Sequence, residues 1–163
     1  TCSGRDIRRR HARRDGRSLA FGRGIVMKLA HVSDSFAVSP QLQAGDMRGL
    51  ADAGFSTVIC NRPDGEEPSQ PTVASIREAA EAAGLAFHHI PVSGGEFPPL
   101  AIEAFARVRA EADGKVLAFC RTGTRSITLD ALANVESEPA EVRIERARRA
   151  GYDLSSLRDR LGE

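Results

Sequence analysis

From residue 27 onward, short apolar runs alternate with longer stretches of helical periodicity, and this alternation limits the possible folds most strongly. The β-branched run 55–60 is typical of a buried strand. After it, Thr72 begins a stretch with apolar residues on one helical face, and Gly84 ends it. Strands that alternate with helices predict an α/β domain with a central, mostly parallel sheet flanked by helices on both faces. The expected strands are 29–32, 36–38, 55–60, 85–92 and 116–119, and the expected helices are 44–53, 72–83, 99–112, 125–133 and two short ones after residue 140.

The charge distribution divides the chain into two parts. Residues 1–26 hold eight arginines and two aspartates, and they show no apolar periodicity before Met27. We interpret them as a disordered or artefactual extension, with Met27 as a native start and residues 27–163 as a single domain. Because the second part is mildly acidic, nucleic acid is not expected as the main partner.

Neither a membrane-spanning segment nor a secretory signal is expected, because no apolar window approaches the required length. We therefore expect a protein of the cytoplasm or a similar reducing compartment, with no membrane partner. The three cysteines, Cys2, Cys60 and Cys120, are too few and too scattered for a disulfide framework or a zinc site. Any chemistry they perform is thiol chemistry.

One of these cysteines ends a strand and opens a polar loop. The apolar run 116–119 is most simply a central strand buried on both faces, and it stops at Cys120. The next six residues are polar or glycine, and a helix is expected from residue 125. A strand, a short loop and a helix start direct several backbone N–H groups at one point, which binds anions and favours the thiolate form of a cysteine. We identify Cys120 as the catalytic nucleophile rather than as a structural buried thiol.

The residues after Cys120 have the side chains that an oxyanion site needs. Arg125 is expected to clamp a tetrahedral oxyanion through its planar fork, a task for which lysine is less suited. Ser126 is expected to donate a hydrogen bond to the sulfur. Ser126 and the remaining loop residues are expected to line the substrate site, and the latter are Arg121, Thr122, Gly123 and Thr124.

A second loop, 61–68, follows the strand that should lie beside the catalytic one, so it should open on the same edge of the sheet. In it, Arg62 and Asp64 are candidate substrate contacts, and Asp64 is also a candidate catalytic acid. The alternative is a simple turn with solvated charges. Cys60, which ends that strand, is either a structural buried cysteine or a resolving thiol for Cys120.

The segment 115–126 resembles the active-site segment of dual-specificity protein phosphatases and, equally, that of rhodanese sulfurtransferases. A wider pattern over residues 27–133 resembles the bacterial beta-lactamase hydrolase-like, phosphatase-like family. This resemblance implies a protein-tyrosine-phosphatase-like α/β fold, a cysteine-based hydrolase or transferase, no metal and no organic cofactor. The segments that carry it are 36–41, 53–55, 61–66, 83–85 and 90–92, together with the cysteine loop.

Two features of the loop bear on the choice of substrate. The phosphatase signature places five residues between cysteine and arginine, whereas this loop has four, as rhodanese-like loops often do. Phosphatases of this type also take a proton from an aspartate after the preceding strand. Here the stretch 92–96 has no aspartate, so Glu96 or Asp64 must serve. A sulfurtransferase needs no such acid.

Phosphatase-like hydrolysis of a phosphomonoester through a covalent Cys120 intermediate is the first expectation, since the resemblance outside the loop points to phosphatases. The alternative is a rhodanese-like sulfurtransferase that carries a Cys120 persulfide in sulfide or thiosulfate metabolism. A third hypothesis is a non-catalytic module that binds an anion or a protein. The expected partners are a small anionic substrate, a phosphoprotein or a persulfide donor. The oligomeric state is left open.

Overall fold

The computed structural model describes residues 19–21 and 25–162. The extension expected over residues 1–26 lies mostly outside these residues, and there it stays a prediction. Its described part forms two strands, β1 (Leu19–Phe21) and β2 (Ile25–Met27), which pair antiparallel with each other. Regular structure therefore begins before the boundary that the sequence predicted at residue 27.

A five-stranded sheet forms the centre of the molecule. Its central strand is β7 (Lys115–Phe119), which lies between β4 (Phe36–Ser39) and β5 (Phe55–Cys60) and is parallel to both. The edges are β6 (Ala86–His89), parallel to β5, and β3 (Ala30–His31), antiparallel to β4. The predicted mostly parallel sheet, with the cysteine-bearing strand at its centre, is confirmed.

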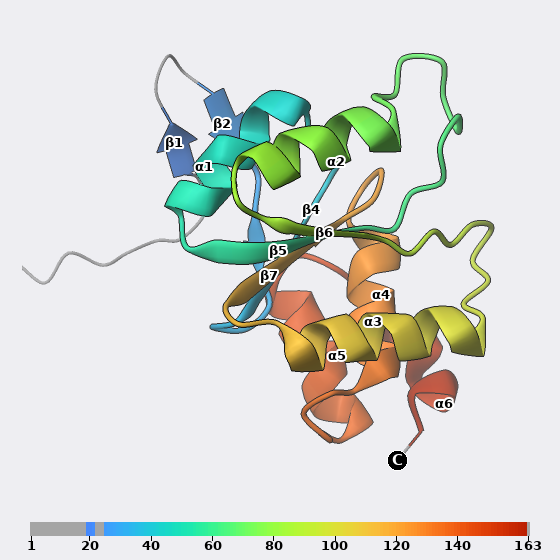
Figure 1. The fold of residues 1–163 in the computed structure, drawn as a ribbon. Coiled ribbons are helices and arrows are strands. Elements are labelled where there is room, and N and C mark those ends of the chain that lie inside the picture. The colour runs from blue at the N-terminus through green and yellow to red at the C-terminus, as the bar shows by residue number, and fades with distance from the viewer. Residues whose placement is uncertain (1–18, 22–24, 163) are drawn as a thin grey trace, which may run out of the picture.

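Helices cover both faces of this sheet, as predicted (Figure 1). One face is covered by α1 (Met47–Asp52) and α2 (Val73–Ala82), and the other by α3 (Pro99–Glu111) and α4 (Thr124–Ala133). The chain then continues on the α4 side with α5 (Ala140–Arg149) and α6 (Arg158–Leu161). Two single turns of 3₁₀ helix precede α1 and α6, at Ala44–Asp46 and Ser155–Leu157.

The predicted stop and start signals act where they were expected. Thr72 caps α2, because its hydroxyl accepts the N–H of Ser75 at 3.2 Å. The predicted strand 85–92 is shorter in the structure, where β6 has four residues, although the N–H groups of Ile90 and Val92 still donate to the carbonyls of Cys60, at the end of β5, and Asn61. Pro91 lies between Ile90 and Val92 and has no N–H to donate.

None of the helices within residues 19–21 and 25–162 has the length and the apolar character that a membrane span requires.

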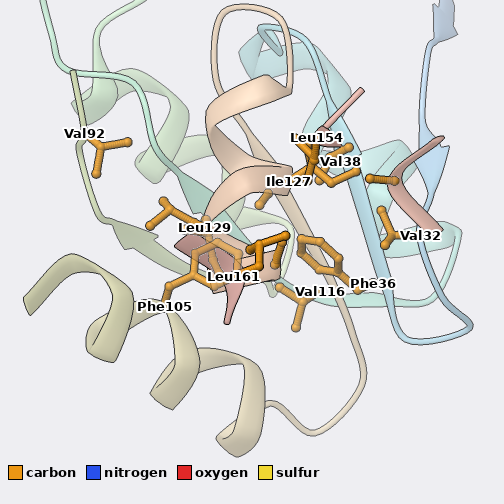
Figure 2. Close-up of a cluster of buried hydrophobic side chains, with 14 of the residues drawn as sticks. Val32, Phe36, Val38, Val92, Phe105, Val116, Ile127, Leu129, Leu154 and Leu161 are labelled. Carbon is orange, nitrogen blue, oxygen red and sulfur yellow. The ribbon is translucent and has the colours of Figure 1, made fainter. Parts of the chain in front are cut away.

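The sheet separates two apolar cores, and β7 contributes to both. Val116 and Ala118 face the core under α3 and α4, whereas Leu117 and Phe119 face the core under α1 and α2. All four side chains are fully buried. Figure 2 shows the first core, where Phe36 of β4 meets Phe105 of α3 edge to face at 5.9 Å between ring centroids. Packing on both faces therefore fixes the position of β7 and of the residue that follows it.

Candidate active site

Cys120 follows the last residue of the central strand and is fully buried. A loop of three residues leads from it to α4, which begins at Thr124. The strand, loop and helix predicted around this cysteine are therefore all present. Because β7 is parallel to β4 and β5, Cys120 lies at the carboxyl edge of the sheet, where the loop after β5 also begins.

Gly123 turns the loop toward the sulfur. Its backbone has φ = 94°, a left-handed conformation that glycine adopts without strain. Its N–H donates to Cys120 Sγ at 3.1 Å. Gly123 is also the N-cap residue of α4, so the positive end of that helix lies beside the sulfur. The loop amides and the helix end therefore favour negative charge at this point.

Arg125 lies beside the sulfur in the first turn of α4. Its Nη1 and Nη2 donate to the two carboxylate oxygens of Glu66 at 2.7 and 2.8 Å, and Nη1 also donates to the Val92 carbonyl at 2.9 Å. The pKa of Arg125 is raised, chiefly by the hydrogen bond to Glu66 and further by the charge of Cys120 and a hydrogen bond to it. A guanidinium has five N–H groups; Glu66 and Val92 take three of them, and the others are available to the Cys120 sulfur and to a substrate oxyanion.

Glu66 is a site residue that the sequence did not reveal. Besides Arg125, its Oε1 accepts the Nε–H of Arg62 at 2.9 Å. The hydrogen bond from Arg125 is the largest cause that lowers the pKa of Glu66 to about 2, and Arg62 lowers it further. The carboxylate is therefore ionised at neutral pH and cannot supply a proton. Its only signal in the sequence is its place in the loop after the strand next to the catalytic one.

Arg62 lies behind Glu66 and is only 2% exposed. Its Nη1 donates to the Gln41 side chain at 3.0 Å, and its Nη2, 3.4 Å from Glu67, has no hydrogen-bond partner within the described part of the chain. Burial and these contacts make Arg62 a support for Glu66. The direct substrate contact expected from the sequence stays a prediction.

Of the two candidate acids, Asp64 has a contact that does not involve the cysteine loop. Its Oδ1 accepts the N–H of Val73 at 2.8 Å and so satisfies the first free amide of α2. Glu96 is exposed in a turn in which its N–H donates to the Ser93 carbonyl at 3.1 Å. The contact with α2 argues against Asp64 as the catalytic acid. The acid role of either residue stays a prediction.

Two substitutions of Asp64 separate these roles. Asp64→Ala is expected to lower the free energy of unfolding by about 1 kcal/mol, as loss of an acceptor at a helix start does. Asp64→Asn keeps an acceptor oxygen but cannot give a proton, and we expect it to retain stability and turnover within about twofold. Chemical denaturation and steady-state kinetics measure the two quantities. If Asp64→Asn loses most of the turnover while it stays folded, the acid role is correct.

The other predicted loop residues differ in what they contact. Ser126 does not hydrogen-bond the sulfur as expected, because its hydroxyl donates to Asn61 Oδ1 at 2.8 Å. Asn61 in turn donates through its own N–H to the Phe119 carbonyl at 2.9 Å, so Ser126 ties α4 to the ends of β5 and β7. The Thr122 hydroxyl donates to the Thr124 hydroxyl at 3.1 Å. Arg121 is exposed, and its Nε lies 3.0 Å from Glu67.

Cys60 ends β5, next to the catalytic strand, and is buried. Its thiol donates to the Arg62 carbonyl at 3.4 Å. Burial raises the pKa of Cys60 to about 11, so this thiol is neutral at neutral pH. The structural role considered for Cys60 is favoured over the resolving role.

No group of three or more His, Cys, Asp or Glu side chains in residues 19–21 and 25–162 is arranged to hold a metal ion.

Glu66 gives the domain a pH dependence that can be measured. Its pKa is lowered from 4.5 to about 2 by folding, so the stability it contributes is complete above pH 4.5 and is lost as the pH falls through 2. Glu66→Gln is expected to cost about 1–2 kcal/mol at pH 7, less than the full shift because the pair is partly exposed. Denaturation of both proteins from pH 7 to pH 2 should show this difference shrinking below pH 4.5. A difference that grows with acid would contradict the assignment.

The chain is similar in sequence to known proteins. The family model of the beta-lactamase hydrolase-like protein, phosphatase-like domain, matches residues 28–137. A beta-lactamase hydrolase-like protein of Agrobacterium fabrum is 37% identical over 134 residues, which make up 78% of this chain and 30% of that protein. The chain thus spans less than a third of the length of this relative.

Solved structures share the same fold. A candidate phosphatase of Neisseria meningitidis superposes with a TM-score of 0.72 at 39% identity, over 82% of this chain and 95% of that one. Kinase associated phosphatase superposes with a TM-score of 0.65 at 16% identity, over 84% of this chain and 93% of its own. The fold is therefore that of the protein-tyrosine-phosphatase-like proteins, as the sequence predicted.

Proposed function

Because this chain belongs to the family of the beta-lactamase hydrolase-like protein, phosphatase-like domain, we propose that it is a cysteine-dependent hydrolase of phosphomonoesters that forms a covalent intermediate at Cys120. The observation that carries this proposal is the arrangement at Cys120. The Gly123 N–H donates to the sulfur, and the Arg125 guanidinium lies beside it with N–H groups that neither Glu66 nor Val92 takes. Nucleophile and oxyanion donors thus meet at one point.

The reaction has two steps. In the first, the Cys120 thiolate attacks phosphorus, an S–P bond forms, and the bond from phosphorus to the ester oxygen breaks. Arg125 and the loop amides hold the phosphoryl oxygens as charge develops on them. In the second step, water attacks the phosphocysteine, the S–P bond breaks, and inorganic phosphate and the thiolate are released.

The leaving group is the demanding part of the first step. An alkoxide must take up a proton as it departs, yet the carboxylate beside Arg125 is ionised and Asp64 binds the start of α2. A leaving group that departs without a proton needs no such acid. We therefore expect esters of acidic alcohols, such as phenols with electron-withdrawing groups, to react faster than alkyl esters.

The same observations favour a second candidate, sulfur transfer. The four residues between Cys120 and Arg125 form a smaller cradle than the five of the phosphatase signature. With thiosulfate, the thiolate attacks the outer sulfur, the sulfur–sulfur bond breaks, and sulfite leaves with its electron pair and needs no proton. The Cys120 persulfide then gives its outer sulfur to an acceptor thiolate or to cyanide, and the thiolate returns.

A paired assay on the purified protein separates these candidates. Hydrolysis of para-nitrophenyl phosphate and sulfur transfer from thiosulfate to cyanide are followed side by side, with Cys120→Ser as the blank. Phosphate release that vanishes in the variant supports the hydrolase. Thiocyanate formation alone supports sulfur transfer instead. If neither product forms, the binding-module hypothesis is favoured and the proposal is wrong. Product formation that persists in Cys120→Ser would also contradict it.

A further inference from the structure

Tyr152 reaches the cysteine loop from the end of the chain. It lies after α5 and beyond the residues that the family model matches. Its hydroxyl donates to the Thr122 carbonyl at 2.9 Å. Its own N–H donates to the Ala147 carbonyl at 2.9 Å, so the C-terminal end of α5 holds the residue in place. A residue distant in sequence thus contacts the loop that holds the nucleophile.

The Tyr152 ring also lies close to Gly123. A Cβ added to Gly123 would clash with the Tyr152 hydroxyl and would lie only 2.9 Å from ring atom Cζ. Such a distance requires a shift of either the ring or the loop. The ring is only partly exposed, and burial raises the pKa of Tyr152, with a further contribution from the charge of Cys120. Tyr152 therefore packs directly on the loop and lies near the sulfur.

The hydrogen bond from Tyr152 has a geometric consequence for the sulfur. The Thr122 carbonyl and the Gly123 N–H belong to one planar peptide group, and no peptide bond is cis between the described residues. In a trans peptide the C=O and N–H point in opposite directions. Because Tyr152 holds the oxygen on one side, the N–H points to the other, where it donates to Cys120 Sγ at 3.1 Å.

We propose that Tyr152 is a positioning residue of the Cys120 loop, which locks the 122–123 peptide so that its N–H faces the nucleophile. Glycine adopts φ above and below zero about equally, so a peptide next to Gly123 is easily turned over unless something holds it. A turned peptide would present a carbonyl oxygen to the sulfur and disfavour negative charge there. The inference rests on the proposed role of Cys120 as a thiolate nucleophile, and it adds a residue outside the matched domain to the site.

The test measures how pH controls the reactivity of Cys120, and it requires no turnover. In the full chain with Cys2→Ser and Cys60→Ser, Cys120 is the only thiol, and its alkylation by iodoacetamide is followed at pH 6 and pH 9.5. Tyr152→Phe removes only the hydroxyl. We expect it to slow alkylation about three- to tenfold at pH 6, which corresponds to about 0.5–1 unit of the pH midpoint, and less than twofold at pH 9.5. The ratio of the two rates corrects for access to the buried sulfur.

Ser75→Ala is the matched control, because it also removes a hydroxyl that donates to a backbone carbonyl, that of Thr72 at 2.8 Å, but on α2. It should leave the ratio of rates unchanged. An unchanged ratio in a folded Tyr152→Phe protein would overturn the inference. If the unsubstituted protein shows no turnover in the paired assay, this counts against the proposed function alone, since alkylation does not depend on turnover.

A second measurement covers the case in which Tyr152→Phe does not fold. Tyr152 is the only tyrosine of the sequence, which has no tryptophan, so tyrosine emission reports on this residue alone. Alkylation of Cys120 in the protein without the other two cysteines is expected to change this emission by more than about a tenth, because the modified sulfur displaces the peptide that Tyr152 holds. Constant emission after complete alkylation would overturn the inference.

Discussion

Replacement of Cys120 by serine is expected to abolish turnover, with a loss of about four orders of magnitude or more in kcat, because the attacking group itself is removed. A serine hydroxyl fits the same space, but it is not ionised near neutral pH and has no base beside it. The Glu66 carboxylate, which binds Arg125, is held by two arginines and has a pKa of about 2, so it is a poor base for a hydroxyl. Stopped assays with high enzyme concentration measure the residual rate.

Cys60→Ser is the matched control for this variant. Cys60 is also buried at the end of a strand, on β5, and a serine hydroxyl can replace its thiol as donor to the Arg62 carbonyl. We expect this variant to keep turnover within about twofold. If Cys60→Ser lost activity as severely as Cys120→Ser, the two thiols would act together, and the assignment of a single nucleophile would be wrong.

The second large effect is expected for Arg125→Ala. Removal of the guanidinium should cost about 2–4 kcal/mol of transition-state stabilisation, a loss of about 30- to 1,000-fold in kcat/KM, by comparison with other oxyanion donors. Glu66 and Val92 take three of the five N–H groups of Arg125. The interaction of the remaining N–H groups with the oxyanion strengthens as charge develops in the transition state. The variant also leaves Glu66 without its bidentate partner and with Arg62 alone, so part of the loss is repulsion of the substrate by a less compensated carboxylate.

Arg125→Lys separates charge from geometry in this prediction. Lysine keeps the positive charge but cannot hold Glu66 and an oxyanion at the same time through a planar fork. It should therefore recover only a small part of the lost rate. Circular dichroism and thermal denaturation check that both variants are folded. Unchanged turnover in folded Arg125→Ala would refute the clamp.

The fold was predictable from the sequence because its signals are local. The apolar run 116–119 is buried on both faces, and that burial places it at the centre of the sheet. Gly84 and Thr72 mark the ends of a helix through their own backbone and side-chain chemistry. The cysteine loop was predictable for the same reason, since strand, glycine and helix start follow one another within a few residues.

The contacts that complete the site were not predictable, since they join distant segments. Glu66 reaches Arg125 across 59 positions and Tyr152 reaches Thr122 across 30, and neither distance leaves a periodic signal. Ser126 was assigned to the sulfur because it is close in sequence, yet Asn61, 65 positions away, takes its hydrogen bond. Tertiary packing, which brings loop 61–68 and the residue after α5 to the edge of the sheet, decides these partners.

The central claim is that Cys120 carries the transferred group, and the mass of the protein during turnover tests it most directly. The protein is quenched within seconds of mixing with para-nitrophenyl phosphate or with thiosulfate, and the peptide 116–121, in which Cys120 is the only cysteine, is weighed. We predict an added phosphoryl group from the first donor, or an added sulfur atom from the second if the enzyme is a sulfurtransferase. Steady product formation from either donor without any mass added at Cys120 would contradict the account.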